Sequence, residues 1–172
     1  MRVMKTMSIE VRRAEPEDCN AVADVHRKTW IHAYGGLIPH KPLLSMLERR
    51  REDWWRKAAN GTSTLLVLDT GTKIAGYATI GLNRTEALKV DGEIYELYLL
   101  PEYQGIGLGS YMFRQCRAML SGLGFQGLAA WCLEDSENAS TFFRATGGLD
   151  VAEGMEDFGG TALKKIGFIW QR

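Results

Sequence analysis

The sequence has no long apolar run, little cysteine and no excess of charge of either sign. No stretch approaches the roughly 20 apolar residues that a membrane-spanning helix needs, and Met1–Met7 is not followed by an apolar segment typical of a leader. Lysine and arginine together number 21, as do aspartate and glutamate, so no net field favours nucleic acid or an anionic membrane surface. We therefore expect a cytoplasmic protein that binds neither nucleic acid nor membrane.

The three cysteines, Cys19, Cys116 and Cys132, are odd in number and widely spaced. This pattern fits neither a disulfide framework nor a zinc site, so we expect reduced, packed thiols and no metal. Internal repeats and low-complexity linkers are also lacking. With 172 residues, 45% of them hydrophobic and 24% charged, the composition is that of a globular protein, and the length suits one buried core. We predict a single domain over residues 1–172.

The N-terminal half has the pattern of a strand, two helices and a hairpin. Residues 8–13 alternate apolar with polar, and an acidic segment around Pro16 begins a helix that Gly35-Gly36 ends. A second helix is predicted from about Pro42 to Asn60, and residues 64–80 read as a hairpin around an Asp-Thr-Gly-Thr turn.

The C-terminal half alternates strands with helices. A strand from Glu93 to Leu100 ends before Pro101, and the elements that follow are a helix at 108–122, a strand at 126–133, a short helix at 137–145 and two strands within 149–172. The order β-α-α-β-β-β-α-β-α-β-β predicts an α/β (α+β) fold, a mixed sheet with helices on its faces.

A glycine-rich turn, Gln104-Gly105-Ile106-Gly107-Leu108-Gly109, joins a predicted strand to a predicted helix. Glycine at alternate positions lets the backbone approach phosphate oxygens closely. The free N–H groups and the positive dipole end of the following helix then face the anion. We interpret this turn as a phosphate-binding site rather than only as a tight connection.

Two other phosphate-binding motifs fit the turn less well. The dinucleotide motif G-x-G-x-x-G would need glycine at Ser110, and an acidic residue about 20 residues later, where the sequence has Trp131-Cys132. A Walker turn would need Lys and then Ser or Thr after its last glycine, and neither follows here. A nucleotide-dependent oxidoreductase is therefore a distant alternative.

Two motifs resemble those of the GNAT superfamily of N-acetyltransferases. Gln104-x-x-Gly107-x-Gly109 is similar to the family's Q/R-x-x-G-x-G/A motif, and Ala139-x-x-Phe142-Phe143-x-x-x-Gly147 is similar to its A-x-x-F-Y-x-x-x-G helix. The order of elements matches over nearly the whole chain. The resemblance implies a mostly antiparallel sheet of about seven strands flanked by about four helices, and transfer of an acetyl group from acetyl-CoA to a primary amine.

The resemblance also implies how the cofactor binds. Backbone N–H groups of the glycine turn would hold the pyrophosphate, and the strand at 97–99 would hydrogen-bond the pantetheine as if it were another strand, beside a gap that the family opens next to this strand. The implied cofactor-binding residues are Leu97, Leu99, Leu100, Gln104, Gly105, Ile106, Gly107, Leu108, Gly109, Ser110, Ser136 and Phe143.

Candidate residues for catalysis and acceptor binding are less distinctive. Glu93 stands at a spacing before Gln104 where some family members carry a carboxylate general base, and strand alternation predicts that Glu96 faces the other way. His26, Trp30 and Tyr34 share one helix face and are candidates to line the acceptor site, with core packing as the alternative. The acceptor is expected to be a small-molecule or peptide amine, and a homodimer is left open.

One position departs from the family pattern. Phe143 stands where the family most often has a tyrosine whose hydroxyl can protonate the leaving thiolate, and the family's asparagine falls on Ser136, with Asn138 fitting only in a shifted register. Cofactor binding therefore carries over better than acid catalysis. The alternative to an enzyme is a degenerate relative that binds acetyl-CoA as a sensor or interaction module.

Overall fold

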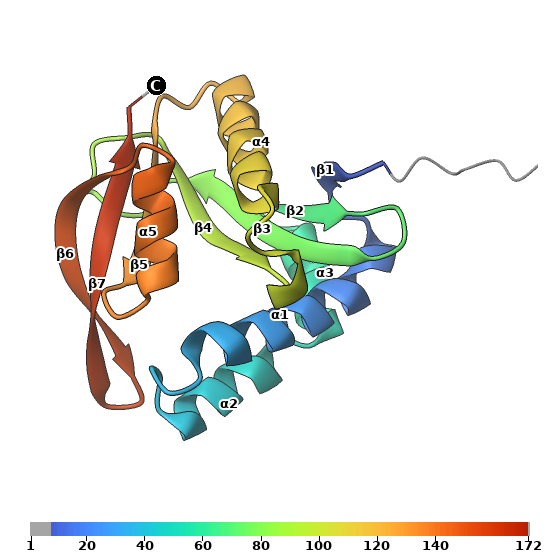
Figure 1. The fold of residues 1–172 in the computed structure, drawn as a ribbon, viewed down its shortest axis with the longest axis horizontal. Helices are drawn as coiled ribbons and strands as arrows, with labels where there is room; N and C mark the ends of the chain where they lie inside the picture. The colour runs from blue at the N-terminus through green and yellow to red at the C-terminus, as the bar shows by residue number, and fades with distance from the viewer. Residues whose placement is uncertain (1–7, 172) are drawn as a thin grey trace, which may run out of the picture.

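The computed structural model describes residues 8–171, so the predictions made for Met1–Met7 lie outside the described residues (Figure 1). Its centre is one sheet with the strand order β1-β2-β3-β4-β5-β7-β6, in which only the β4–β5 pair is parallel. The predicted mixed, mostly antiparallel sheet of seven strands is confirmed. The strands are β1 (Glu10–Arg13), β2 (Thr64–Asp69), β3 (Ile74–Leu82), β4 (Gly92–Leu99), β5 (Leu128–Leu133), β6 (Leu149–Phe158) and β7 (Thr161–Trp170).

Five α-helices rather than four lie within residues 8–171: α1 (Cys19–Tyr34), α2 (His40–Arg49), α3 (Glu52–Ala59), α4 (Leu108–Gly122) and α5 (Glu137–Ala145). The predicted second helix is divided at Arg50 and Arg51. The carbonyl of Arg51 accepts hydrogen bonds from the backbone of Trp54 and Trp55, while the Trp55 indole donates to the carbonyl of Arg50 at 3.0 Å. This break turns the Trp55 ring into the core, where it is fully buried. None of the described helices is long and apolar enough to cross a membrane.

Helices cover both faces of the sheet, which explains the continuous apolar run in β2. Leu66 and Leu68 pack with α4 and α5 in the larger core cluster, whereas Leu65 and Val67 pack with α1 and α3 on the other face. A strand buried on both faces needs apolar residues at every position instead of alternation. All three cysteines are free and buried, as predicted.

The sheet opens between β4 and β5 (Figure 1). Their parallel pairing covers only Gly92–Ile94 and Leu128–Ala130, after which β5 continues beside β7 alone. In β4, Tyr95 has no partner on β3, because Ile94 pairs with Ile80 and Glu96 pairs with Thr79. Such a β-bulge bends its strand, and here it lies where β4 leaves β5.

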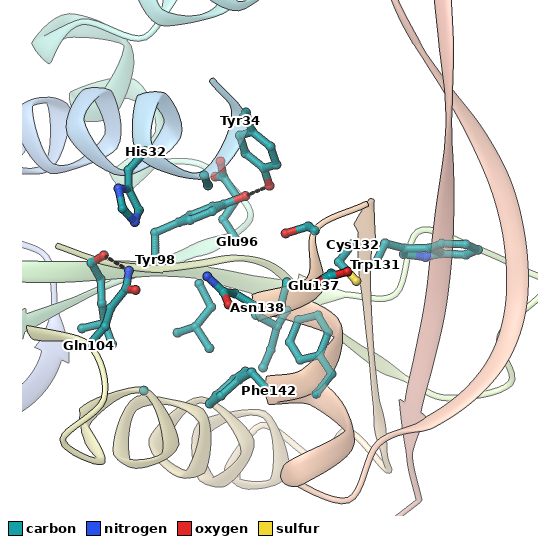
Figure 2. A pocket seen from close by; sticks show the side chains of 18 of the residues that line it. His32, Tyr34, Glu96, Tyr98, Gln104, Trp131, Cys132, Glu137, Asn138 and Phe142 are labelled. Carbon is teal, nitrogen blue, oxygen red and sulfur yellow. Dashed lines mark hydrogen bonds between the residues drawn. The ribbon is translucent and has the colours of Figure 1, made fainter. Parts of the chain in front are cut away.

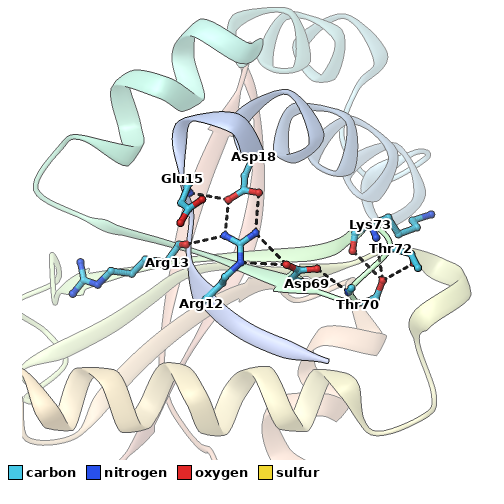
Figure 3. Close-up of polar contacts among 9 residues, drawn as sticks. Arg12, Arg13, Glu15, Asp18, Asp69, Thr70, Thr72 and Lys73 are labelled. Carbon is cyan, nitrogen blue, oxygen red and sulfur yellow. Dashed lines mark hydrogen bonds and ion pairs between the residues drawn. The ribbon is translucent and has the colours of Figure 1, made fainter. Parts of the chain in front are cut away.

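A charge cluster fixes the start of α1 to the sheet edge (Figure 3). The Arg12 guanidinium on β1 donates to Asp18 at 2.7 Å and to Asp69 on β2 at 3.2 Å. The hydrogen bond from Arg12 holds the pKa of Asp18 below its usual value. The cluster therefore anchors α1 at one end, and the other end of the helix, at Tyr34, lines a cavity between β4 and β5.

Candidate active site

A cavity of about 650 Å³ lies where β4 and β5 separate (Figure 2). Its walls come from the end of α1, from β4 and β5, from the glycine turn and the start of α4, and from α5. Segments far apart in the sequence therefore meet at one site. The predicted site residues that line it are Tyr34, Leu97, Leu99, Gln104, Gly105, Gly107, Gly109, Ser110, Ser136 and Phe143.

The other predicted cofactor residues lie beside the cavity. Leu100 is buried, Leu108 packs against the core, and the Ile106 side chain is 69% exposed at the tip of the turn. None of the three lines the cavity. The side chains of these three residues therefore do not contribute to the cavity wall, although Ile106 and Leu108 belong to the turn that forms part of it.

The glycine turn has the conformation that its sequence predicts. Gly105 and Gly107 have φ values of 78° and 88°, which non-glycine residues rarely adopt. Gly107 is also the N-cap of α4, and no side chain caps this helix, so the N–H groups of its first turn have no intrahelical acceptor. A Cβ on Gly107 would meet no atom within 4 Å. Open space in front of free N–H groups suits a phosphate.

The two faces of the sheet give the cavity two chemically different halves. On the α4 and α5 face, Leu97 and Leu99 form an apolar wall beside the glycine turn. On the α1 face, Glu96 and Tyr98 of β4 oppose Trp131 of β5, and the end of α1 adds Tyr34. The gap between β4 and β5 connects the halves, so a chain-like ligand could run through the sheet from one to the other.

Glu93 does not line the cavity. Its side chain is 2% exposed, and its carboxylate accepts hydrogen bonds from the backbone N–H of Arg84 at 3.1 Å and from the Arg84 guanidinium at 2.7 Å. The Arg84 guanidinium also stacks on the Tyr95 ring, 3.8 Å from its centroid. These contacts tie the connection between β3 and β4 to the sheet, which is a structural role.

Glu96 lines the cavity instead, and the prediction that it faces away from Glu93 is wrong. Tyr95 is the extra residue of the bulge, so alternation is interrupted between these two positions. Glu93 shares its face with Ala129 across the sheet, and Glu96 contacts Tyr77 on that same face. A β-bulge has no clear signal in one sequence, so simple alternation could not find Glu96.

The Glu96 carboxylate has three hydrogen-bond donors. Its Oε1 accepts from the Arg50 guanidinium at 2.5 Å and from the Tyr77 hydroxyl at 3.4 Å, and its Oε2 accepts from the Thr79 hydroxyl at 3.2 Å. A carboxylate has about four acceptor positions. One position, on Oε2, is therefore left without a partner among residues 8–171.

His26 and Trp30 lie behind the cavity wall and do not line it. His26 is fully buried, with Nδ1 3.0 Å from the Tyr77 hydroxyl, and the Trp30 indole donates to the same hydroxyl at 3.0 Å. Burial, with a smaller effect of Arg50, lowers the pKa of His26 to about 3, so its ring is neutral. Both residues support the wall from the core, which was the alternative reading of this helix face.

Tyr34 reaches the cavity and meets Tyr98 of β4 there. Their hydroxyls are joined by a hydrogen bond (Figure 2). Burial raises the pKa of Tyr34 to about 12, with smaller effects of Glu96 and Cys132, and burial also raises the pKa of Tyr98. Both phenols therefore stay protonated across the physiological range.

The part of the cavity wall that α5 forms includes aromatic rings, and Phe143 occupies the position where a tyrosine would supply a hydroxyl. The Phe143 ring packs 5.4 Å from the rings of Phe168 and Trp170, and Phe142 lies beside it. Both phenylalanines line the cavity, as do Ser136 and Asn138 near the start of α5. Neither phenylalanine carries a hydrogen-bond donor in its side chain.

The sequence reading also missed Trp131, whose ring lies over glycines of the neighbouring strands. A Cβ on Gly167 of β7 would stand 3.0 Å from this ring, and one on Gly154 of β6 would stand 3.7 Å from it. Glycines inside two adjacent strands were the signal, because an interior strand glycine often marks a close approach. Cys132, the next residue, also lines the cavity, and burial raises its pKa to about 11, which keeps it a thiol.

Comparison with known proteins gives consistent matches. The acetyltransferase (GNAT) family model matches residues 21–147. The uncharacterized N-acetyltransferase YuaI of Bacillus subtilis (strain 168) is 31% identical over 162 residues, which are 94% of this chain and 92% of that protein. A spermidine N(1)-acetyltransferase of Thermoplasma acidophilum is 25% identical over 120 residues, 69% of this chain and 74% of that protein. The crystal structure of the PaiA N-acetyltransferase of Thermoplasma acidophilum, in complex with coenzyme A, superposes with a TM-score of 0.72 at 18% identity, covering 92% of this chain and 98% of that one.

Proposed function

Because the chain belongs to the acetyltransferase (GNAT) family, we propose that it transfers the acetyl group of acetyl-CoA to a primary amine of a small molecule or peptide. The observation that carries this proposal is the cavity that passes through the gap between β4 and β5. A long cofactor and a separate acceptor could meet there from the two faces of the sheet. We take residues 1–172 to act as a single domain, as expected for a family match over residues 21–147.

The α4 face is the proposed acetyl-CoA side. Free N–H groups at the start of α4 and the open space before Gly107 suit the pyrophosphate. The edge of β4 from Tyr95 to Leu99 has no β5 partner, so its backbone is free to pair with the pantetheine amides. Ser110 and Ser136 add hydroxyls on this side. A structural neighbour solved in complex with coenzyme A supports the choice of this cofactor.

The α1 face is the proposed acceptor side, and its residues favour an amine that arrives as a cation. The acidic residues that line the cavity are Glu96, Asp135 and Glu137, whereas no lysine or arginine of residues 8–171 lines it. The rings of Tyr34, Tyr98 and Trp131 add aromatic faces, which attract ammonium groups. A relative named for spermidine acetylation supports an amine of this kind.

Glu96 is the proposed general base in place of Glu93. The acceptor amine must lose a proton before it attacks the thioester, and Glu96 is a cavity carboxylate with one free acceptor position on Oε2. A positioned base of this kind contributes about 10²- to 10⁴-fold to the rate. The proton would reach Oε2 directly or through one water.

A panel of amines scored for CoA release tests the proposed activity. It should contain spermidine, a lysine-containing peptide, a free peptide N-terminus and an arylalkylamine. Turnover of at least one amine is expected. Binding of acetyl-CoA without turnover of any amine would favour a sensor or interaction module, the second candidate, which Phe143 supports because it supplies no acid.

Paired variants test the assignment of the base. Glu96→Gln should lower kcat by ~10²-fold or more while acetyl-CoA affinity changes little, because the amide cannot accept the amine proton. Glu93→Gln is the matched comparison on the same strand and should keep kcat within about threefold of wild type. The opposite ranking of the two kcat values would return the role to Glu93.

A further inference from the structure

The hydroxyl pair of Tyr34 and Tyr98 has one proton more than its hydrogen bond uses. The two phenols carry two O–H protons, and the bond between them uses one. No residue from 8 to 171 accepts a hydrogen bond from the second O–H. Both side chains are half-buried and line the cavity, so this O–H is free to donate to a ligand that enters it.

The pair stands at the gap between β4 and β5. Tyr98 belongs to β4, and Cys132 on β5 and Glu96 on β4 are both close enough to Tyr34 to influence its pKa, after the larger effect of burial. Figure 2 shows Tyr98 extending from β4 to meet Tyr34 from the end of α1. The proposed path of the cofactor from the α4 face to the acceptor side leads through this gap.

The other hydroxyls of the cavity wall are placed differently. Tyr95 donates to the carbonyl of Leu82 at 2.5 Å, so its proton is already used. Ser110 belongs to α4 beside the glycine turn, and Ser136 lies at the start of α5. Phe142 and Phe143 offer no donor from α5. Among the described residues that line the cavity, the Tyr34–Tyr98 pair is therefore the group that has a free hydroxyl proton on the α1 side.

We propose that the Tyr34–Tyr98 pair donates a hydrogen bond to the sulfur of acetyl-CoA as that sulfur leaves as a thiolate. This inference rests on the proposed function. The amine nitrogen forms the C–N bond, and the C–S bond breaks with its electron pair going to sulfur. The ammonium loses one proton to Glu96 before the attack, and the second proton leaves the nitrogen for water as the C–S bond breaks. The phenols keep their protons while one O–H stabilises the new negative charge. CoA departs as the thiolate and is protonated by solvent.

The acidities fit a donor that does not transfer its proton. Burial raises the pKa of Tyr34 to about 12, whereas a thiol ordinarily has a pKa near ~8.5. The thiolate is therefore the weaker base of the two anions, and the proton stays on the phenol. A preorganised donor aimed at developing charge is typically worth about 10²- to 10³-fold in kcat.

The pKa of the CoA thiol, measured while CoA is bound, tests the inference without any acceptor. A hydrogen bond to the thiolate lowers this pKa, so wild-type protein should bind CoA with its thiol pKa about one pH unit below that of free CoA. The Tyr34→Phe/Tyr98→Phe variant should lose this difference. Thiolate absorbance in the ultraviolet, with desulfo-CoA as the blank, gives the titration. Equal thiol pKa values in wild type and variant would overturn the inference.

Two further measurements separate this role from structural damage. Tyr111→Phe removes a hydroxyl from α4 outside the cavity and should leave the thiol pKa of bound CoA at the wild-type value. Tyr34→Phe alone, at the last residue of α1, provides a milder variant if the double one does not fold. With spermidine or another active amine, kcat of the double variant should fall ~10²-fold while KM for acetyl-CoA is unchanged. A shifted thiol pKa without turnover of any amine would contradict the proposed function and leave the hydrogen bond standing.

Discussion

Two glutamates three residues apart on β4 have different surroundings and different expected roles. Both carboxylates pair with an arginine, Glu93 with Arg84 and Glu96 with Arg50. The two differ in access, because Glu93 is buried away from the cavity whereas Glu96 lines it and keeps one free acceptor position. Burial and hydrogen bonding, more than residue type, therefore separate structure from chemistry here.

Glu93→Gln should lower the free energy of unfolding by about 1–3 kcal/mol, because charge-assisted hydrogen bonds from Arg84 are lost in a buried place. Urea unfolding measures it. Glu86→Gln, an exposed change in the same β3–β4 connection, is the matched control and should have little effect. Unchanged stability of Glu93→Gln would mean that this ion pair does not hold the connection in place.

His26 should make stability depend on pH. Its folded pKa, about 3, lies below the ordinary value of 6.5. Above pH 6.5 the ring is neutral in both the folded and the unfolded protein, so its full contribution to the free energy of unfolding is present. As pH falls from 6.5 toward 3, the unfolded chain takes up a proton that the folded protein does not, so stability is lost at roughly 1.4 kcal/mol per pH unit.

Urea unfolding of wild type and His26→Gln at pH 7 and pH 4.5 isolates this contribution. The wild type should lose on the order of 2 kcal/mol more than the variant between these pH values. His32→Gln, an exposed change on the same helix, should keep the wild-type pH dependence. Parallel pH dependences for wild type and His26→Gln would show that this ring is protonated in the folded protein.

At the scale of elements, the glycine turn and the start of α4 form one unit. Gly107 has a left-handed φ of 88° and is the N-cap of α4. The turn requires a left-handed backbone at this residue, and phosphate binding requires uncovered N–H groups at the start of the helix. Glycine meets both requirements, because it adopts positive φ without strain and has no side chain to cover the N–H groups.

Gly107→Val should weaken acetyl-CoA binding by at least tenfold, about 1.4 kcal/mol, because the side chain would fill the space proposed for the pyrophosphate. Calorimetry measures the affinity. Gly124→Val is the matched control at the other end of α4, with a φ of 89° and open space around its Cβ. It carries the same backbone strain away from the cavity, so equal affinity losses in both variants would remove the pyrophosphate assignment.

At the scale of the whole molecule, the proposed cofactor lies across the gap between β4 and β5 and so contacts both parts of the divided sheet. A ligand that binds only the folded state stabilises it by about 2.7 kcal/mol at one hundred times its Kd. For a chain of this length such a gain raises Tm by roughly 5–10 °C.

Acetyl-CoA and CoA should therefore raise Tm by about this amount, whereas NADH should not. Thermal unfolding with each ligand at matched concentration makes the comparison. The NADH arm is the control for a general nucleotide effect. Stabilisation by NADH and not by CoA would instead indicate a nucleotide-dependent oxidoreductase.

Local sequence patterns predicted the order of the strands and the position of the glycine turn, but not the division of the second helix into α2 and α3. Both depend on contacts between residues close in the chain: the periodicity of apolar residues and the need for glycine at positive φ. The expectation that Leu97, Gln104 and Gly109 lie at the cavity, where the structure has them, came from the resemblance of the turn to the family motif.

Which polar side chains meet depends on the packing of distant segments. The bulge at Tyr95 moved Glu96 into the cavity wall, packing of α1 placed His26 and Trp30 behind that wall, and the chain from α1 to β4 brought Tyr34 to Tyr98. These outcomes depend on contacts between residues distant in sequence, and the first also depends on a bulge that the composition of β4 does not specify. Local patterns therefore predict where the cofactor turn lies, whereas long-range packing selects the residues for the chemistry.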